Sequence, residues 1–510
     1  METSVNIQSG LTDMSNKIHI TTLMQKSSVG FGTSGARGRV KDMTDQVCYA
    51  YTIAFLQHLE AQGQLNAGDQ IGIAGDLRNS TARIMNAVAA AITNKGYQPV
   101  NCGTIPSPAV ACYGLQQKIP TIMVTGSHIP DDRNGIKFNT ATGEILKQDE
   151  EGIRKQTVTI PSDLFSADGS FTESSHYLPE TDPAAGQHYR QRYLDFFPAN
   201  CLADLKIGLY EHSGVGRDIL SDLLSELGGN VIRLGRSEKF IPVDTEAIRE
   251  EDIKLAQKWS KEYSLDAIVS TDGDADRPLV GDENGHWLRG DITGILCARY
   301  LGITHIATPV SSNTAVEKSG LFRSVSRTRI GSPYVIAAMQ QIEHKVGENI
   351  AGYEANGGFL QETPVEYNGK TLTALPTRDA AIVIFSLLAM ANQQGKKISE
   401  LTDSLPARFT ASNRIKEFPT ATAKKYIAQL IDKNAASPYQ AIEAIFGQLC
   451  GKVENTDLTD GLRITFQNGE IIHLRPSGNA PEFRCYNEAD SLSRVKSLNQ
   501  ACMEIISKWR

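Results

Sequence analysis

Long hydrophobic stretches are scarce in this chain of 510 residues. The longest, residues 380–391, is interrupted by Ser386 and is shorter than the roughly 20 apolar residues that a membrane-spanning helix needs. We therefore interpret it as a buried helix. The first twenty residues are polar throughout and lack the apolar core of a secretory signal. Both absences predict a cytoplasmic protein without a membrane partner.

Paired cysteines and an excess of basic residues are also absent. The eight cysteines are scattered with no CxxC or CxH spacing, which argues against a zinc site and against a disulfide framework. With 51 basic and 58 acidic residues the net charge is −7, which argues against nucleic acid as the main partner. A local cleft lined by arginine and lysine can still attract a small anionic substrate. These observations leave an enzyme or a small-molecule-binding protein as the expected class of protein.

Length and composition indicate several globular domains. A chain of 510 residues exceeds what one core usually supports, and 40% hydrophobic with 21% charged residues is ordinary for a globular protein. Apolar strands alternate with amphipathic helices, which is the pattern of α/β domains. After a polar leader at residues 1–28, we expect three doubly wound α/β domains over residues 29–165, 186–289 and 290–400. A hairpin with an Asn-Gly turn predicts a fourth, α+β domain over residues 406–510.

Ser127 stands where a short apolar strand gives way to glycine, proline and asparagine, so we expect it at the tip of a loop that follows a strand. Such loops often carry function. The Ser127 oxygen can attack, hold a covalent group or cap a helix. A serine hydrolase is disfavoured, because the adjacent residues Ser127 and His128 cannot normally pair as nucleophile and base.

An acidic loop follows the apolar strand expected at residues 265–269. Asp272, Asp274 and Asp276 occupy alternate positions, so a tight loop can turn all three carboxylates toward one hard cation such as Mg²⁺. An EF-hand calcium loop fits less well, because Arg277 stands at its sixth position, where glycine is needed. An aspartate-nucleophile phosphotransferase loop is disfavoured by Asp276 at the fifth position of its pattern. A solvated acidic turn explains poorly why the acidic residues directly follow an apolar run.

Three further loops combine glycine with polar side chains. Residues 31–39 carry three glycines and end on arginines, including Arg37, and can cradle a phosphate through backbone N–H groups. Glu354 and Asn356 lie two apart in a glycine-rich loop, a spacing that suits hydrogen bonds to sugar hydroxyls. A guanidinium, a hydroxyl and backbone N–H groups suit a phosphate that does not react. These groups are offered by Arg475, Ser477, Gly478 and Asn479.

Taken in order, the loops resemble the α-D-phosphohexomutase superfamily, which includes phosphomannomutases, phosphoglucomutases and phosphoglucosamine mutases. The shared motifs are Thr-Gly-Ser-His-x-Pro with Asn-Gly-x-Lys, Asp-Gly-Asp-Ala-Asp-Arg, Gly-x-Glu-x-Asn-Gly-Gly and Arg-x-Ser-Gly-Asn-x-Pro. The resemblance covers nearly the whole chain after Phe31. It implies four domains around a central cleft, with a terminal domain that hinges. It also implies phosphoryl transfer between O1 and O6 of a hexose phosphate through a bisphosphorylated intermediate, of the phosphomannomutase type first and the phosphoglucomutase or phosphoglucosamine mutase type next.

The resemblance further implies roles for single residues. Ser127 would be the phosphoserine and would hold Mg²⁺ together with the three aspartates. Lys137 and Arg37 would stabilise charge or transfer a proton. The sugar and its phosphates would be bound by Arg277, Glu354, Asn356, Arg475, Ser477, Gly478 and Asn479. The implied cofactors are Mg²⁺ and a hexose 1,6-bisphosphate as activator and intermediate, the implied partner is a small phosphosugar, and we expect a monomer or homodimer.

Some positions depart from the pattern of the superfamily. Tyr353 follows the glycine of the sugar loop, Asn356 stands in place of serine, and residues 478–481 read Gly-Asn-Ala-Pro instead of Gly-Thr-Glu-Pro. These departures leave the sugar open, together with two alternatives: a phosphosugar-binding protein without turnover and a metal-dependent phosphatase. Retention of Ser127, the aspartates and Lys137 favours the active enzyme.

Overall fold

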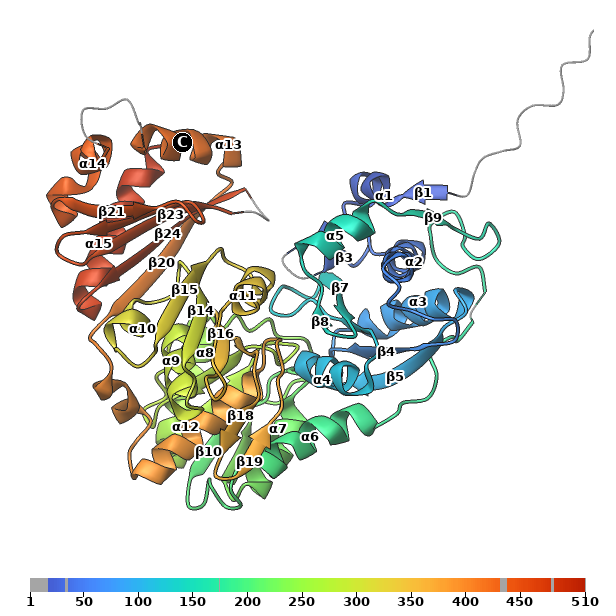
Figure 1. Ribbon diagram of the computed structural model, residues 1–510, viewed down its shortest axis with the longest axis horizontal. Helices are drawn as coiled ribbons and strands as arrows, with labels where there is room; N and C mark the ends of the chain where they lie inside the picture. The colour runs from blue at the N-terminus through green and yellow to red at the C-terminus, as the bar shows by residue number, and fades with distance from the viewer. Residues whose placement is uncertain (1–16, 33–34, 174, 432–437, 478–480, 510) are drawn as a thin grey trace, which may run out of the picture.

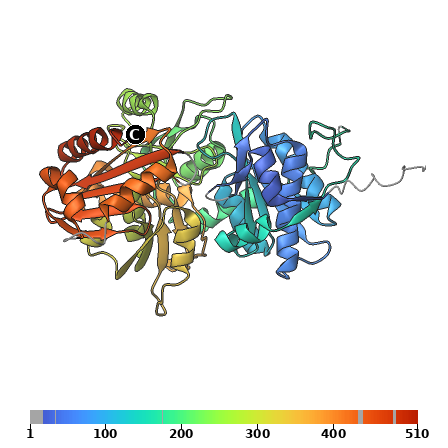
Figure 2. The same ribbon diagram turned by 90° about the horizontal axis from the view of Figure 1, so that it is seen from above.

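Four domains follow one another in the computed structural model, which describes residues 17–32, 35–173, 175–431, 438–477 and 481–509. Domain I runs from β1 (Lys17–His19) to β9 (Thr157–Thr159), and domain II from α6 (Ala184–Phe196) to β13 (Pro278–Gly281). Domain III runs from α9 (Gly290–Tyr300) to α12 (Ala380–Gln394), and domain IV from β20 (Phe409–Lys416) to α15 (Leu492–Ser507). Domains II and III join domain I to domain IV in Figure 1, and Figure 2 shows domain I beside the other three.

The first three domains share one sheet topology, in which three parallel strands are flanked by an antiparallel fourth. The order is β5-β4-β6-β7 in domain I, β11-β10-β12-β13 in domain II and β15-β14-β16-β17 in domain III. These strands are β4 (Gln70–Gly75), β5 (Gln98–Thr104), β6 (Thr121–Val124), β7 (Arg133–Thr140), β10 (Lys206–Tyr210), β11 (Asn230–Leu234), β12 (Ala267–Thr271), β14 (His305–Pro309), β15 (Ser324–Thr328), β16 (Ile350–Tyr353) and β17 (Phe359–Gln361).

The repeated topology places the candidate loops at equivalent positions. Ser127 follows β6, the three aspartates follow β12, and Glu354 follows β16. Each of these loops leaves the carboxyl end of a parallel strand and returns in the antiparallel one, and the carboxyl ends of parallel strands are where open α/β sheets bind ligands.

Burial explains why these strands are continuous apolar runs. Every residue of β6, β12 and β16 is buried, and since successive side chains point to opposite faces, both faces of each sheet are covered. The helices that pack against these sheets include α9 and α12, together with α2 (Asp45–Ala61), α3 (Thr81–Asn94), α4 (Ser107–Gln117), α7 (Arg217–Glu226), α8 (Glu250–Tyr263) and α11 (Ser332–Met339). The shorter helices α5 (Lys147–Arg154) and α10 (Ala315–Lys318) belong to domains I and III. The α/β class predicted from the sequence is therefore confirmed.

The apolar run at residues 380–391 lies in α12, and all twelve of its residues are buried. Helix α12 packs against both α9 and β13, so domains II and III share one hydrophobic core. The prediction of a buried helix is confirmed. Among the described residues, no helix combines the length and hydropathy that crossing a membrane requires.

Domain IV differs from the others, as predicted. Its five-stranded sheet is antiparallel, in the order β20-β24-β23-β22-β21. The predicted hairpin joins β22 and β23, and Gly469 adopts a φ of 81° in its turn, a conformation that favours glycine. Its remaining elements are α13 (Thr420–Leu430), α14 (Gln440–Cys450), β21 (Val453–Asp457), β22 (Leu462–Phe466), β23 (Ile471–Pro476) and β24 (Glu482–Ala489).

The polar leader expected at residues 1–28 is corrected for its second half. Strand β1 pairs with β9, and helix α1 (Ile20–Ser27) buries Ile20 and Leu23 in the core of domain I. The amphipathic spacing of two apolar residues in a largely polar segment is enough to dock a two-turn helix, because the rest of the domain supplies the core. Residues 1–16 lie outside the described residues.

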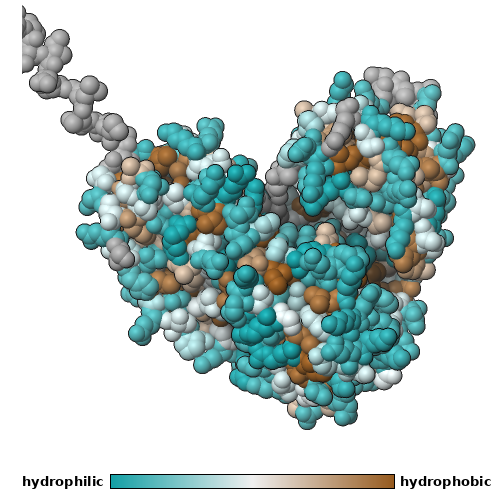
Figure 3. All heavy atoms as spheres, turned by 180° about the vertical axis from the view of Figure 1, so that it is seen from behind, coloured by the Kyte–Doolittle hydropathy of each residue, from teal (hydrophilic) through white to brown (hydrophobic). Residues whose placement is uncertain are grey.

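The remaining short strands are β2 (Gly30–Phe31), β3 (Ala36–Arg39), β8 (Gly143–Glu144), β18 (Val365–Tyr367) and β19 (Lys370–Leu372), and η1 (Ser399–Ser404) is a 3₁₀ helix before domain IV. A deep notch separates domain I from domain IV on the surface, with domains II and III at its floor (Figure 3). The notch is the cleft around which the four domains are arranged.

Candidate active site at the domain junction

Ser127 lies at the boundary between domains I and II. Its side chain is buried, its φ is 55°, and its N–H donates to the Thr125 hydroxyl at 2.8 Å. A positive φ is uncommon outside glycine and is maintained only where the surroundings enforce it. The Ser127 hydroxyl donates to Asp272 Oδ2 at 2.6 Å. The hydroxyl of one domain is thus aimed at the acidic loop of the next.

The loop is held by Arg78, which the sequence patterns did not reveal. Its guanidinium donates to the carbonyl oxygens of Ser127 at 2.8 Å, Ile129 at 2.6 Å and Pro130 at 2.8 Å. The buried carboxylate of Asp76 pairs with Arg78 at 3.1 Å. A Cβ at Gly126 would lie 2.6 Å from Arg78 Cζ, so glycine is required there for the guanidinium to approach the backbone.

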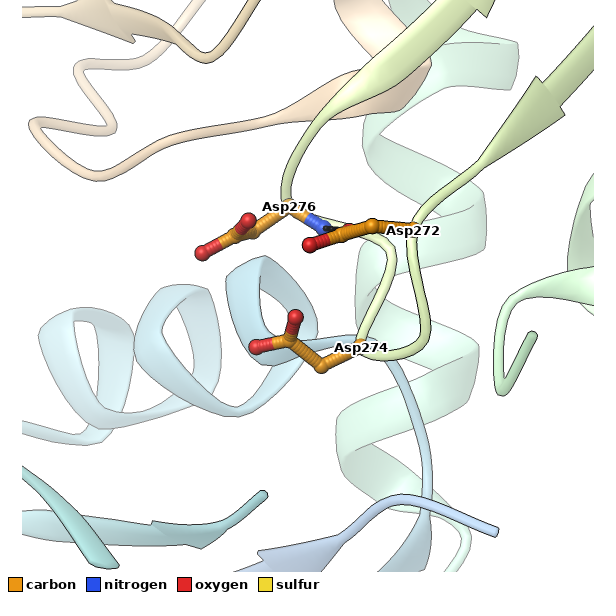
Figure 4. Close-up of side chains that lie close together, drawn as sticks. All are labelled: Asp272, Asp274 and Asp276. Carbon is orange, nitrogen blue, oxygen red and sulfur yellow. Dashed lines mark hydrogen bonds between the residues drawn. The ribbon is translucent and has the colours of Figure 1, made fainter. Parts of the chain in front are cut away.

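The three aspartates of the β12–β13 loop point to the same side (Figure 4). One carboxylate oxygen from each of Asp272, Asp274 and Asp276 lies within 4.8 Å of the others, and all three residues are buried. Asp274 Oδ1 and Asp276 Oδ1 are buried and make no hydrogen bond within the described part of the chain. Buried unpaired carboxylate oxygens are costly unless a cation satisfies them. This donor set fits a hard divalent cation.

Backbone constraints hold the acidic loop in place. A Cβ at Gly273 would lie 2.6 Å from the carbonyl oxygen of Ser127, so only glycine lets the two loops approach this closely. Ser107, at the start of α4, donates from its hydroxyl to Asp274 Oδ2 at 2.5 Å, and its N–H donates to the Asp274 carbonyl oxygen at 2.9 Å. Domain I therefore positions the acidic loop of domain II from two sides.

Lys137 of domain I lies beside the acidic loop of domain II. Its Nζ is 2.5 Å from Asp274 Oδ2 and 2.9 Å from Asp276 Oδ2. Burial lowers the pKa of Lys137, but the two carboxylates outweigh it and raise the pKa above its ordinary value. Lys137 is therefore charged at neutral pH. Burial and the negative charges of Asp274 and Asp276 also raise the pKa of Asp272, well above its usual range.

Two arginines complete the cationic surroundings. Arg277 Nε lies 3.5 Å from Asp276 Oδ1, and Arg277 Nη1 lies 2.6 Å from Nδ1 of His128. Burial and the charge of Arg277 lower the pKa of His128 to about 3, so that imidazole is neutral. Arg37 lies on β3, and burial with the nearby charges of Arg277 and Arg378 lowers its pKa to about 10, so it remains protonated at neutral pH.

The β16–β17 loop lies next to this cluster. Arg378, just before α12, is 3.0 Å from Asp276 Oδ2 and 3.2 Å from Glu354 Oε2. Asn356 Oδ1 accepts from the Gly358 N–H at 2.9 Å, and the Asn356 carbonyl oxygen accepts from the Thr245 hydroxyl at 2.7 Å. Glu354 is therefore linked to the acidic loop by one guanidinium, whereas Asn356 shapes its own turn.

The predicted phosphate loop belongs to domain IV, where β23 ends and β24 begins. Arg475 Nε lies 2.9 Å from Asp460 Oδ2, and the Ser477 N–H donates to the Glu482 carbonyl oxygen at 2.8 Å. Gly478 and Asn479 lie outside the described residues. Ser127, Lys137, Arg277 and the three aspartates thus meet at one junction, while Arg475 and Ser477 lie in the domain across the notch.

Comparison with known proteins gives the same domain sequence. Phosphoglucomutase/phosphomannomutase family models match alpha/beta/alpha domain I at residues 28–163, domain II at 190–285, domain III at 289–409 and the C-terminal domain at 427–505. A phosphomannomutase of Salmonella muenchen is 44% identical over 479 residues, covering 94% of this chain and 95% of that protein. One of Sinorhizobium fredii is 43% identical over 475 residues, covering 92% and 96%.

Solved structures share the fold at low sequence identity. A phosphoglucomutase/phosphomannomutase family protein from Burkholderia thailandensis matches with a TM-score of 0.71 at 18% identity, covering 94% of this chain and 96% of that one. Fold and relatives together define the class of this enzyme as an intramolecular phosphotransferase. The chain belongs to the phosphoglucomutase/phosphomannomutase family.

Proposed function

We propose that the chain is a phosphosugar mutase of the phosphomannomutase type, which moves a phosphoryl group between O1 and O6 of a hexose phosphate. The observation that carries this proposal is the 2.6 Å hydrogen bond from the Ser127 hydroxyl to Asp272, one of three buried carboxylates on the neighbouring domain. A serine beside a divalent-cation site can donate and retrieve a phosphoryl group. The relatives at 44% and 43% identity described above are both phosphomannomutases.

Phosphorylated Ser127 would give its phosphoryl group to the free hydroxyl of a hexose monophosphate. The P–Oγ bond breaks, a P–O bond to the sugar forms, and the hydroxyl proton leaves to a base. The bisphosphorylated sugar would then turn within the notch and return its other phosphoryl group to the Ser127 oxygen. A free hexose 1,6-bisphosphate would therefore prime an unphosphorylated enzyme.

The chain's own residues have distinct parts in this scheme. Lys137, held protonated by Asp274 and Asp276, would stabilise negative charge on the transferring phosphoryl group, as would Arg37 and Arg277. Mg²⁺ held by Ser127 and the three aspartates would neutralise further charge on that group. Glu354 and Asn356 would bind sugar hydroxyls, and the loop at residues 475–479 would bind the phosphate that does not react.

The test is turnover of mannose, glucose and glucosamine 1-phosphates, measured side by side with Mg²⁺ and with the matching 1,6-bisphosphate as primer. We expect isomerisation to the 6-phosphates, with the highest kcat/KM for mannose 1-phosphate. Release of inorganic phosphate without isomerisation would instead identify a phosphatase. Binding of all three sugars without turnover would identify a phosphosugar-binding protein.

A further inference from the structure

Arg378 lies at the junction of three domains and belongs to none of the sequence motifs. It is 2% exposed and lies two residues before the first residue of α12. Its Nε lies 3.0 Å from Asp276 Oδ2 in the acidic loop of domain II, and its Nη1 lies 3.2 Å from Glu354 Oε2 in the sugar loop of domain III. One planar group therefore contacts both loops with two different N–H groups.

A carboxylate of domain I adds to this junction. Glu144 accepts hydrogen bonds from the Thr377 hydroxyl at 2.5 Å and from the Ser332 hydroxyl at 2.9 Å, which tie domain I to domain III. Burial opposes the charge of Arg378, yet the surrounding carboxylates of Asp276, Glu144 and Glu354 raise its pKa. Arg378 is a permanent buried cation with acidic groups from three domains around it.

The sugar loop is shaped to receive this side chain. A Cβ at Gly358 would lie 2.5 Å from Arg378 Cδ and 2.6 Å from its Cγ. The Gly358 N–H also donates to Asn356 Oδ1, and its carbonyl oxygen accepts from the Glu354 N–H at 3.0 Å. The turn that presents Glu354 is thus closed directly over the stem of Arg378.

We propose that Arg378 is a positioning residue that sets the sugar loop against the metal loop, holding Glu354 and Asp276 in a fixed relation. This inference deepens the proposed function and rests on it for the part that concerns the sugar. Because Arg378 and Lys137 both contact Asp276 Oδ2, Oδ1 is the oxygen of Asp276 left without a hydrogen bond. That oxygen lies 3.5 Å from Arg277 Nε. By occupying Oδ2, Arg378 would leave Oδ1 as the oxygen that Asp276 can offer to a cation.

A lysine at position 378 could not make both of these contacts in the same way. The guanidinium offers N–H donors in a rigid fork that reaches two carboxylates at once, whereas an ammonium is a single point charge on a flexible chain. Arg378→Lys keeps the buried charge, so it isolates the fork geometry from the charge. Arg378→Met removes both while filling a similar volume.

The experiment compares Arg378→Lys and Arg378→Met with the wild-type enzyme and with Arg323→Met. Arg323 is an exposed arginine of the same domain, whose side chain is 58% exposed. Mn²⁺ affinity is measured by calorimetry without sugar, and kcat and KM are measured for mannose 1-phosphate. We expect both Arg378 variants to bind Mn²⁺ about tenfold more weakly or worse and to raise KM, while Arg323→Met changes neither.

A double-mutant cycle with Glu354→Gln separates positioning from general destabilisation. If Arg378 acts through Glu354, Arg378→Lys should raise KM little further when Glu354→Gln is already present, because changes in contacting residues are not additive. If the two substitutions instead multiply each other's effect on KM, Arg378 does not act through Glu354, and the proposed role toward the sugar loop is wrong. Unchanged Mn²⁺ affinity in Arg378→Lys would overturn the metal-loop part. If Arg378→Met does not fold, the comparison of Arg378→Lys with the wild-type enzyme tests the proposal alone. If the wild-type enzyme turns over no hexose phosphate, the proposed function fails, and the Mn²⁺ comparison still decides the role toward Asp276.

Discussion

Ser127 is the residue on which the proposed chemistry depends. Ser127→Ala removes the oxygen that would carry the phosphoryl group, so we expect turnover to fall by about 10³-fold or more and the intact mass to show no covalent phosphate after incubation with a hexose 1,6-bisphosphate. The control is Ser497→Ala, because the Ser497 hydroxyl is exposed and donates only to the backbone of its own helix. Retained phosphate on the Ser127→Ala protein would place the covalent site elsewhere.

His473 makes domain IV sensitive to acid. Burial lowers the pKa of His473 from 6.5 to about 4, and its Nε2 lies 2.6 Å from the carbonyl oxygen of Asp460. Below pH 6.5 the unfolded chain binds a proton that the folded one takes up only near pH 4, so stability is full above pH 6.5 and falls as the pH drops toward 4. We expect a loss of about 2 kcal/mol between pH 7.5 and pH 5 from this group.

The measurement for His473 is the unfolding of domain IV, followed by hydrogen–deuterium exchange of β23 and β24 at the two pH values. His473→Gln keeps an N–H donor and does not titrate, so its loss of stability between the two values should be smaller. An equal loss in His473→Gln would assign the acid sensitivity of domain IV to other groups of that domain.

Single residues show where sequence reasoning ends. Ser127, Lys137 and the three aspartates were predicted because each lies in a short motif next to an apolar strand. Arg78 and Arg378 were missed, since neither stands in a distinctive local pattern. The loop carbonyls that accept from Arg78 lie 49 to 55 residues away in the chain, and the two carboxylates that contact Arg378 lie 24 and 102 residues away. Only the fold brings such partners together. Residues that would bind ligands are thus easier to predict from local patterns than the residues that orient them.

Helix α1 shows the same limit for an element. It was not predicted because its burial depends on two side chains, Ile20 and Leu23, that are 0% and 5% exposed in the folded domain. By contrast, α12, β6 and β12 were predicted, because an apolar run marks an element whose whole surface is buried. A short element docked on an existing core carries too little pattern of its own.

We expect Ile20→Ala to destabilise domain I by roughly 2–5 kcal/mol, through lost burial and the cavity that remains. The readout is hydrogen–deuterium exchange of α1 and α2, since a chain of four domains does not unfold in one step. Gln25→Ala is the matched control, because Gln25 is exposed on the same helix. Equal protection in Ile20→Ala and Gln25→Ala would show that α1 adds nothing to the stability of domain I.

The β12–β13 loop should couple metal binding to stability. Lys137, Arg277 and Arg378 offset only part of the repulsion among the three buried carboxylates, and two of the carboxylate oxygens make no hydrogen bond. Mg²⁺ should therefore raise the Tm of the protein, and a chelator should lower it. A ligand at 100 times its Kd stabilises the folded state by about 2.7 kcal/mol. Asp274→Asn should abolish the Mg²⁺ effect, and Asp222→Asn, at an exposed position of α7, should retain it. If Mg²⁺ still raises the Tm of both variants, the loop is not the metal site.

At the scale of the whole molecule, the proposed reaction would need domain IV to move, because the bisphosphorylated sugar would have to turn within the notch. Its described ties to domain III include a hydrogen bond from Asn313 Nδ2 to the Arg408 carbonyl oxygen at 2.9 Å, one from the Thr314 N–H to Glu488 at 3.1 Å and one from the Ile330 N–H to Asp460 at 3.0 Å. Domains II and III share a core through α12, whereas the core of domain IV is separate. A rigid body joined by polar contacts can rotate as a unit at small cost.

Binding of a doubly charged sugar should therefore close the notch. We expect the radius of gyration, measured by X-ray scattering in solution, to decrease when glucose 1,6-bisphosphate is added to the wild-type protein, because Arg475 on domain IV and the cations of domain I would be drawn to the same ligand. Arg475→Ala should abolish most of the decrease, whereas Lys496→Ala, at an exposed position of α15, should not. If Arg475→Ala contracts as fully as the wild-type protein, closure does not depend on Arg475, and the assignment of this residue to the non-reacting phosphate is wrong.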